Sequence, residues 1–212
     1  MMSRLPFTGV PLVLALAITT VEAQRAAPDS MVSAPVTGIR YEVTADNPSL
    51  AAQKLGVAMS FDVANDGVVV LSLPAWTPGA YEISNFARNV SNFRPTQDGV
   101  PLRWDKMDFD TWRVRPVKGG RIIVAFDFTA DSLDNAMAWT RPDFALFNGT
   151  NIFMYPEGRS KEFASTVLIK TDPTYKIATG MASAGASRTY KSPNYHDLVD
   201  MPVFVEIGRA HV

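Results

Sequence analysis

Apolar side chains recur at every second position along several segments of this 212-residue chain. The clearest run covers residues 55–63, a second covers residues 122–128, and a weaker one covers residues 163–169. A period of two places one face of a strand against a core and the other face in water. These segments therefore predict half-buried β-strands rather than amphipathic helices.

Six shorter segments are further predicted strands: residues 39–45, 68–73, 102–107, 111–115, 152–155 and 176–179. Glycine-containing turns separate many of them, at residues 65–67, 98–99, 118–120 and 156–158. Helical patterns are short and confined to residues 83–90 and 196–200. Many short strands without a long helical period predict an all-β fold, a mostly antiparallel β-sandwich.

The start of the chain resembles a secretory signal. A weakly basic beginning is followed by an apolar run at residues 7–21, and small residues at Val21 and Ala23 suit a signal peptidase. A membrane anchor is the alternative, but the run is shorter than the roughly 20 residues of a spanning helix, and Pro11 interrupts it. We expect a signal peptide at residues 1–23, cleavage after Ala23, and an exported protein, periplasmic or extracellular, without membrane attachment.

After the signal, we expect a flexible leader at residues 24–36, rich in Pro, Ala and Ser, and a sandwich domain at residues 37–205. Residues 206–212 are predicted to be a non-native tail. The codons ATC GGA AGA GCA CAC GTC of a common sequencing adapter encode residues 207–212, which suggests an open reading frame that runs into adapter sequence.

Composition excludes several functions. The 20 basic and 21 acidic residues give a net charge of −1 and form no basic stripe, which argues against a nucleic-acid partner. The absence of cysteine excludes disulfides, thiolate nucleophiles and cysteine-ligated zinc.

Catalytic patterns are also missing. The two histidines, His196 and His211, do not form the i, i+4 pair of a zinc helix, and no serine lies in a Gly-x-Ser-x-Gly elbow. The carboxylates Asp105, Asp108 and Asp110 are better explained as a charged rim between two strands than as a catalytic pair. We therefore predict no catalytic, cofactor-binding or metal-binding residue in this chain.

The most informative stretch is residues 73–94. Within it, Pro78 and Gly79 occupy the central positions of a predicted type II turn, where glycine accepts the positive φ that other residues resist. Trp76 and Tyr81 flank this turn. The stretch is either a rigid corner capped by aromatic rings or an exposed aromatic ledge for a partner domain or peptide.

Two neighbouring features accompany this stretch. Arg88 lies between Phe86 and Phe93 in sequence, where a guanidinium can stack on a ring or reach a carboxylate. Trp104 and Trp112 alternate with charged residues, as expected for cross-strand pairs. A glycan site can also use tryptophans, but core packing is the better explanation here.

Three strings in order, LPAWTPGAYEISNFARNVSNFR, WDKMDFDTWRV and NYHDLVDMP, make the chain resemble the N-terminal domain of glycyl-aminopeptidase-like metallopeptidases, peptidase family sixty-one. The resemblance implies an exported enzyme of three parts: an N-terminal β-sandwich, a central zinc domain with a His-Glu-x-x-His helix, and usually a C-terminal PDZ domain. None of the family's zinc ligands or its catalytic glutamate has a counterpart in this sequence. The matched positions would serve folding and docking against the missing domain: Trp76, Pro78, Gly79, Tyr81, Arg88, Trp112 and Asp200.

The resemblance thus implies a non-catalytic domain, truncated before the catalytic one, that buttresses this missing zinc-binding partner and the peptide cleft. Zinc is expected in the missing domain and no cofactor in this chain. The alternative is a stand-alone exported β-sandwich that binds a peptide or a glycan.

Overall fold

The computed structural model describes residues 31–133 and 136–208. The predicted signal peptide at residues 1–23 and most of the predicted leader lie outside the described residues, as do residues 209–212.

The largest sheet has eight strands in the order β14-β15-β12-β1-β2-β8-β4-β5. Its strands are β1 (Val36–Thr44), β2 (Lys54–Val63), β4 (Val90–Gln97), β5 (Val100–Pro101), β8 (Gly120–Thr129), β12 (Ser165–Lys170), β14 (Ala182–Ser183) and β15 (Thr189–Ser192). Among the strand pairs of the described residues, β1 with β12 is parallel and every other pair is antiparallel.

Two four-stranded sheets complete the fold, in the orders β11-β3-β7-β6 and β13-β16-β10-β9. Their strands are β3 (Val69–Ser72), β6 (Arg103–Lys106), β7 (Thr111–Arg115), β11 (Tyr155–Pro156), β9 (Trp139–Arg141), β10 (Phe144–Phe147), β13 (Tyr175–Thr179) and β16 (Val203–Ile207). The helical segments are short: α1 (Asn47–Ala51), the 3₁₀ helix η1 (Phe86–Asn89), α2 (Gly149–Ile152) and α3 (Tyr195–Val199).

The alternating segments form the centre of the large sheet. Along β2, buried and half-exposed residues alternate without interruption, and its ten residues pair with the ten of β8, with Val57 opposite Phe126. The predicted strands at residues 55–63 and 122–128 are therefore confirmed. Their buried side chains face the rest of the core because successive residues of a strand point to opposite faces of the sheet.

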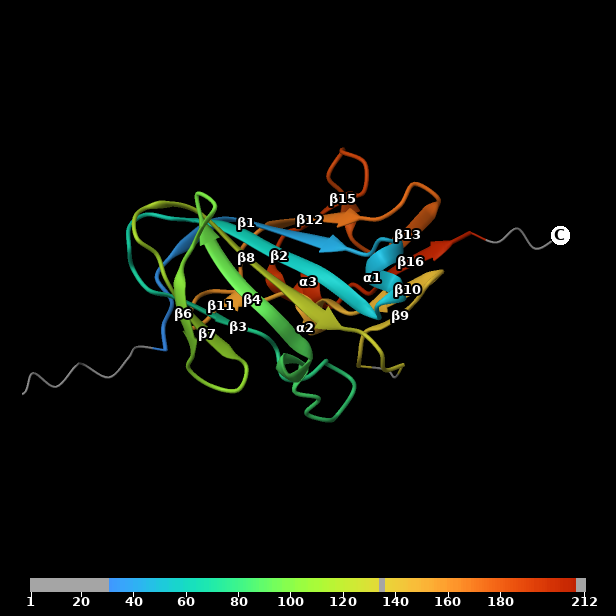
Figure 1. The fold of residues 1–212 in the computed structure, drawn as a ribbon, viewed down its shortest axis with the longest axis horizontal. Coiled ribbons are helices and arrows are strands. Elements are labelled where there is room, and N and C mark those ends of the chain that lie inside the picture. The colour runs from blue at the N-terminus through green and yellow to red at the C-terminus, as the bar shows by residue number, and fades with distance from the viewer. Residues whose placement is uncertain (1–30, 134–135, 209–212) are drawn as a thin grey trace, which may run out of the picture.

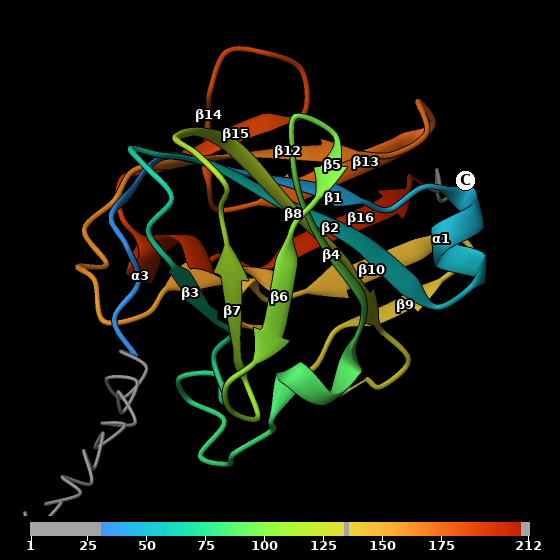
Figure 2. The same cartoon turned by 60° about the vertical axis from the view of Figure 1, so that its left-hand side comes forward.

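The two smaller sheets lie on one side of the large sheet, as Figures 1 and 2 show from two directions. The ring of Tyr41 on β1 lies 4.7 Å from that of Phe153, and Phe93 on β4 stacks on Trp112 of β7 with ring centres 5.4 Å apart. The chain is thus a mostly β protein with antiparallel sheets, consistent with the predicted sandwich.

One predicted strand is wrong. Residues 152–155 do not form a strand, because Ile152 ends helix α2 and only Tyr155 and Pro156 pair with β3. Ile152, Phe153 and Met154 are all fully buried, so a continuous apolar run here reflects burial on every side rather than a pleated strand. The predicted helix at residues 83–90 is present in shorter form as η1, and the one at residues 196–200 is present as α3, shifted by one residue.

Residues on both sides of the predicted sandwich domain, 37–205, take part in its hydrogen bonds and strands. Ser33 is fully buried, its N–H donates to the carbonyl of Glu157, and its hydroxyl accepts from the N–H of Val70. This end of the predicted leader is therefore held against β3. At the other end, Glu206 and Ile207, placed in the predicted tail, are the last residues of β16.

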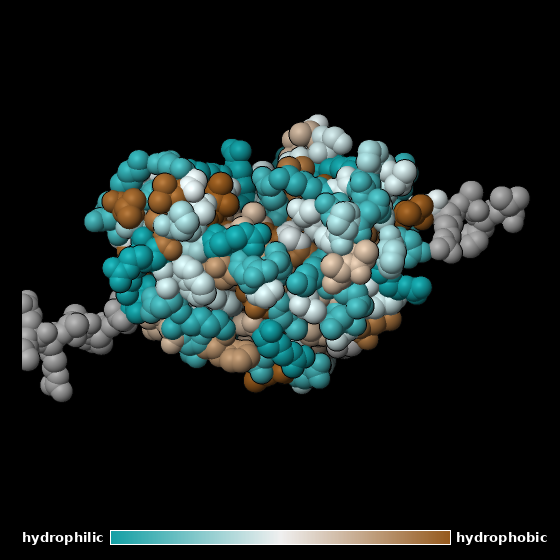
Figure 3. All heavy atoms as spheres, in the orientation of Figure 1, coloured by the Kyte–Doolittle hydropathy of each residue, from teal (hydrophilic) through white to brown (hydrophobic). Residues whose placement is uncertain are grey.

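The surface view in Figure 3 shows hydrophobic side chains in small separate groups among hydrophilic ones, so the face drawn there has no continuous apolar band. Within residues 31–133 and 136–208, no helix is long and apolar enough to cross a membrane.

Candidate functional site

The turn predicted at residues 77–80 is present. The N–H of Ala80 donates to the carbonyl of Thr77 at 3.1 Å, and Gly79 has a φ of +88°. These are the hydrogen bond and the positive φ of a type II turn, with Pro78 fixing the preceding backbone angle. Pro78 and Gly79 therefore shape a tight projection between β3 and η1, visible at the lower edge of the fold in Figure 1.

Apolar side chains of this projection point into solvent. Trp76 is 51% exposed, Ile83 is 73% exposed and Tyr81 is 96% exposed. Together with Glu82 they line an open hollow of about 390 Å³. We call Trp76, Tyr81, Glu82 and Ile83 the ledge. Single exposed apolar residues are common, but three within eight positions around one hollow form a local apolar surface.

The base of the ledge is firmly attached. The carbonyl of Ala75 accepts hydrogen bonds from the N–H groups of Ser84 and Asn85, at 2.9 and 2.8 Å. The hydroxyls of Thr77 and Thr150 are 2.6 Å apart, which links the turn to α2. The projection is therefore a braced corner with exposed aromatic side chains.

Helix α2 also connects the ledge to the third family-like string. A Cβ at Gly149 would lie 2.7 Å from the Cα of Val199, so only glycine allows α3 to approach α2 this closely. Asp200 follows α3, and its N–H donates to the carbonyl of His196. Thr77 and Val199 thus contact consecutive residues of α2, which brings two distant parts of the sequence together.

Trp112 belongs to the core. It is 2% exposed, and its ring lies nearly parallel to that of Phe93, at 13°. Phe93 also meets Trp104 edge to face, with ring centres 4.8 Å apart, and the ammonium of Lys106 lies 4.6 Å from the centre of the Trp112 ring. The predicted cross-strand pairing of aromatic and charged residues is confirmed, and Trp112 is not available to a ligand.

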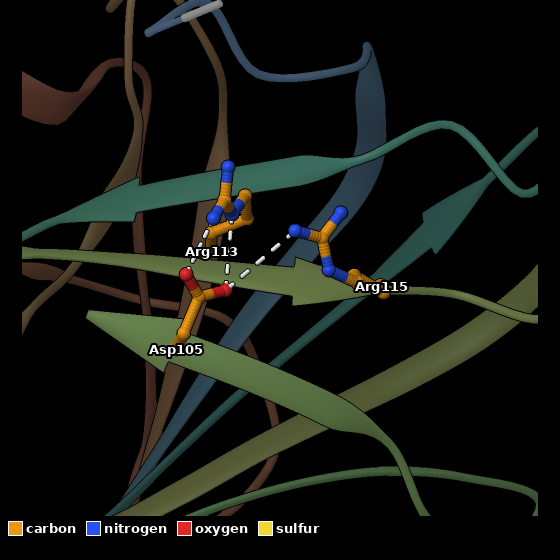
Figure 4. A network of polar contacts seen from close by, with 3 residues as sticks. All are labelled: Asp105, Arg113 and Arg115. Atoms are coloured by element: carbon orange, nitrogen blue, oxygen red, sulfur yellow. Dashed lines mark hydrogen bonds and ion pairs between the residues drawn. The ribbon is translucent and has the colours of Figure 1, made fainter. Parts of the chain in front are cut away.

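The carboxylates near Trp112 form a structural ion-pair network, drawn in Figure 4. Asp105 on β6 accepts two hydrogen bonds from the guanidinium of Arg113 on β7, at 3.0 and 2.5 Å, and lies 3.9 Å from Arg115. The bonds from Arg113 hold the pKa of Asp105 below its ordinary value. A carboxylate with a lowered pKa that accepts two hydrogen bonds from one guanidinium is suited to strand pairing and not to proton transfer.

Arg88, a predicted docking position, and His196, one of the two histidines, lie apart from the ledge contacts. Arg88 in η1 is exposed, and within the described part of the chain it makes no ring stacking or ion pair of the kind the sequence suggested. His196 is exposed on α3. No three His, Cys, Asp or Glu side chains gather as a metal site in residues 31–133 and 136–208.

The sequence patterns did not identify three members of this site, Glu82, Ile83 and Thr150. Ile83 was placed in a predicted helix, yet it lies before η1 and lines the hollow. Thr150, which fixes the turn, lies in a segment with no strand or helix pattern. The signal for Thr150 was the sequence Asn148 to Asn151, because a capping box forms there with the Asn151 side chain accepting from the Asn148 N–H.

Several solved structures resemble this fold. Among solved structures, an aminopeptidase N family protein from Idiomarina loihiensis is similar, with a TM-score of 0.72 and 23% identity, over 82% of this chain and 31% of that one. An M1 zinc metallopeptidase from Deinococcus radiodurans (TM-score 0.46, 15% identity, 81% and 42% coverage) and leukotriene A4 hydrolase from Saccharomyces cerevisiae (TM-score 0.48, 10% identity, 80% and 28% coverage) are more distant. The chain thus spans less than half of each of these chains. No curated protein matches it.

The family model described as Peptidase M61 N-terminal domain matches residues 40–208. This range begins in β1 and extends one residue past β16, so it includes all three sheets. The resemblance of the three strings is confirmed, and the chain belongs to the Peptidase M61 N-terminal domain family.

Proposed function

We propose that this chain is the non-catalytic N-terminal domain of an exported zinc metallo-aminopeptidase, and that its ledge docks against the catalytic domain beside the peptide cleft. The zinc ion and its ligands would reside in that second domain, and peptides would be the substrates. The signal-like residues 1–23 support export.

The observation that carries the proposal is the exposure of the ledge. Burying a large apolar side chain contributes about 1.5–3 kcal/mol, so leaving Trp76, Tyr81 and Ile83 in water forgoes a substantial stabilisation. Tyr81 moreover has a φ of +56°, a conformation that non-glycine residues rarely adopt. An exposed aromatic residue on a strained, braced turn favours a role in recognition over a role in folding.

The test needs the sequence downstream of this chain and the domain it encodes. If a His-Glu-x-x-His segment follows in frame, the two domains can be produced separately and mixed. We expect a complex, and hydrolysis of aminoacyl chromogenic substrates that depends on zinc and is higher in the presence of this chain. Ile83→Ser with Tyr81→Ser should weaken the complex at least about tenfold, since two buried anchors are lost.

A matched control is available at the turn between β7 and β8. Val117 is 73% exposed, the same fraction as Ile83, but lies outside the ledge. Val117→Ser should leave complex formation unchanged. Equal binding by the ledge variant and the control would refute the docking role.

The ledge also suits a second function, a stand-alone module for a peptide or glycan. Its open hollow of about 390 Å³ beside Trp76 and Tyr81 is within the size range of small-ligand sites, about 300–1,000 Å³. A stop codon directly after this chain in genomic DNA, together with binding of an oligosaccharide or oligopeptide that Trp76→Ala abolishes, would favour the module over the peptidase domain.

A further inference from the structure

A second hollow, unrelated to the ledge, lies at the other end of the large sheet, where β1, β12, β15 and β14 run side by side in Figure 2. It has a volume of about 490 Å³ and opens to solvent. We call it the β12 groove. Three consecutive residues from each of three strands or strand ends line it, at residues 38–40, 164–166 and 191–193, with Ala182 at the edge.

Small side chains create the groove. In the strand register, Arg40, Thr166, Lys191 and Ala182 form one row across four strands, so their side chains share the solvent face of the sheet. Residues two positions away from this row are Gly38, Ala164 and Pro193, which are all exposed and short. They leave a depression where longer side chains would otherwise cover the sheet.

Gly38 lies in a β-bulge of strand β1. The pairing of β1 with β2 shifts between Thr37 and Arg40, and Gly38 has a φ of +61°. The carbonyl of Gly38 accepts from Arg121, whose guanidinium also bonds Asp62. A Cβ at Gly38 would lie 3.0 Å from the carboxylate of Asp62. The floor of the groove is therefore fixed by a bulge and an ion pair.

Two cations border this floor. Arg40 and Lys191 are two strands apart, about 10 Å between backbones, and both are exposed. The nearby carboxylates are engaged elsewhere, since Glu42 pairs with Lys170 and Asp62 pairs with Arg121. Within residues 31–133 and 136–208, neither Arg40 nor Lys191 has an ion-pair partner.

We propose that the β12 groove binds a small organic carboxylate with an apolar body, such as the C-terminus of a short peptide or a fatty acid. The carboxylate would lie between Arg40 and Lys191, because charge-assisted hydrogen bonds from Arg and Lys to a carboxylate are stronger than hydrogen bonds between neutral groups. The apolar body would cover Ala164, Ala182 and Pro193. The volume of the β12 groove, about 490 Å³, is within the range of small-ligand pockets, about 300–1,000 Å³.

Titration followed by ¹H–¹⁵N correlation spectra tests this directly, with N-acetyl-Ala-Leu and hexanoate as probes and their uncharged amides as controls. We expect both carboxylates to shift the backbone signals of Gly38, Ala164 and Ala182, and the amides to bind about tenfold more weakly. Stronger binding of one of the two carboxylates would support the proposed site. It would also identify its ligand as a peptide C-terminus, if N-acetyl-Ala-Leu binds better, or as a fatty acid, if hexanoate does.

Variants supply the second readout. Arg40→Gln and Lys191→Gln should each weaken carboxylate binding about tenfold, whereas Lys118→Gln, which alters an exposed ion pair with Asp98, should not. All three positions are exposed, so the fold should be retained. Amides that bind as well as carboxylates, shifts confined to other residues, or equal binding by the Arg40 and Lys118 variants would overturn the proposal.

Discussion

The hydroxyl of Thr77 lies 2.6 Å from the hydroxyl of Thr150, and this hydrogen bond joins the exposed turn to the buried helix α2. Thr150 is 2% exposed, so water competes poorly for its hydroxyl. The bond therefore ties a projection rich in exposed apolar groups to the protein core.

Removing either hydroxyl should loosen the ledge. We expect Thr77→Val and Thr150→Val each to lower the free energy of unfolding by about 0.5–1.5 kcal/mol, with the double variant costing less than the sum. Urea denaturation of the four proteins in the cycle measures the coupling. Strict additivity would mean that the two hydroxyls do not interact.

The two tryptophans of the matched strings should respond in opposite ways. Trp112→Ala should cost about 3–5 kcal/mol of unfolding free energy, because a large ring is removed from the core. Trp76→Ala should change it by no more than about 0.5 kcal/mol, since half of this side chain is already in water. Chemical denaturation distinguishes them, and a large loss for Trp76→Ala would place it in the core.

Tyr81 should be replaceable without loss of stability. Its φ of +56° suits asparagine better than tyrosine, and its side chain is 96% exposed. We expect Tyr81→Asn to leave the unfolding free energy unchanged or to raise it by up to about 1 kcal/mol. A thermal melt checks this, and a clear drop in melting temperature would show that the ring is needed for folding.

The Asp105 network should make stability depend on acid pH. Its pKa is lower in the folded chain than in the unfolded one, so its contribution is present above the unfolded value of about 4 and is lost as the pH falls through the folded value. Asp105→Asn should therefore be destabilising near neutral pH and progressively less so in acid. Urea unfolding at several pH values measures this, with Asp98→Asn, from an exposed pair with Lys118, as the control.

Two buried tyrosines should limit stability in alkali. Tyr41 and Tyr195 donate to the carbonyls of Met154 and Phe153 at 2.7 and 2.6 Å, and burial raises the pKa of both phenols above the usual value of about 10. Because the folded pKa is the higher one, stability is full below about pH 10 and falls as the pH rises above it.

Tyr41→Phe checks the alkaline effect. It should lower the unfolding free energy near neutral pH by about 0.5–1.5 kcal/mol, since the Met154 carbonyl loses a donor. Above about pH 10 the variant should lose less stability than the parent chain, because one group fewer must be kept neutral. Parallel curves for the two proteins would exclude Tyr41 as a source of alkaline unfolding.

Alternating sequence patterns identified the strands that have one buried face and one solvent-exposed face. They did not identify segments that are irregular or buried on all sides. Strand β2 alternates throughout and was predicted correctly. Strand β4 was missed because its eight residues include Pro95 and several polar side chains, and a bulge at Ser91–Arg94 interrupts its pairing. The buried run at Ile152–Met154 was misread because its burial comes from all sides.

The turn at Pro78 and Gly79 was predictable because the required angles restrict the residue types. The approach of α2 to both the turn and α3 was not, since it depends on contacts between residues far apart in the sequence, such as Thr77 with Thr150 and Gly149 with Val199. Local propensity carries no information about such pairings.

Strand β16 is an inner strand of its sheet, with β10 on one side and β13 on the other. During synthesis, β10 and β13 leave the ribosome first and have no partner between them until Ile207 has been added and has cleared the exit tunnel. Strand β1 likewise waits for its parallel partner β12. Such pairing between distant segments makes folding slow. The sheet that holds β16 and the β12 side of the large sheet can therefore be completed only after nearly all of the domain has been translated, whereas β1, β2, β8 and β4 can pair earlier.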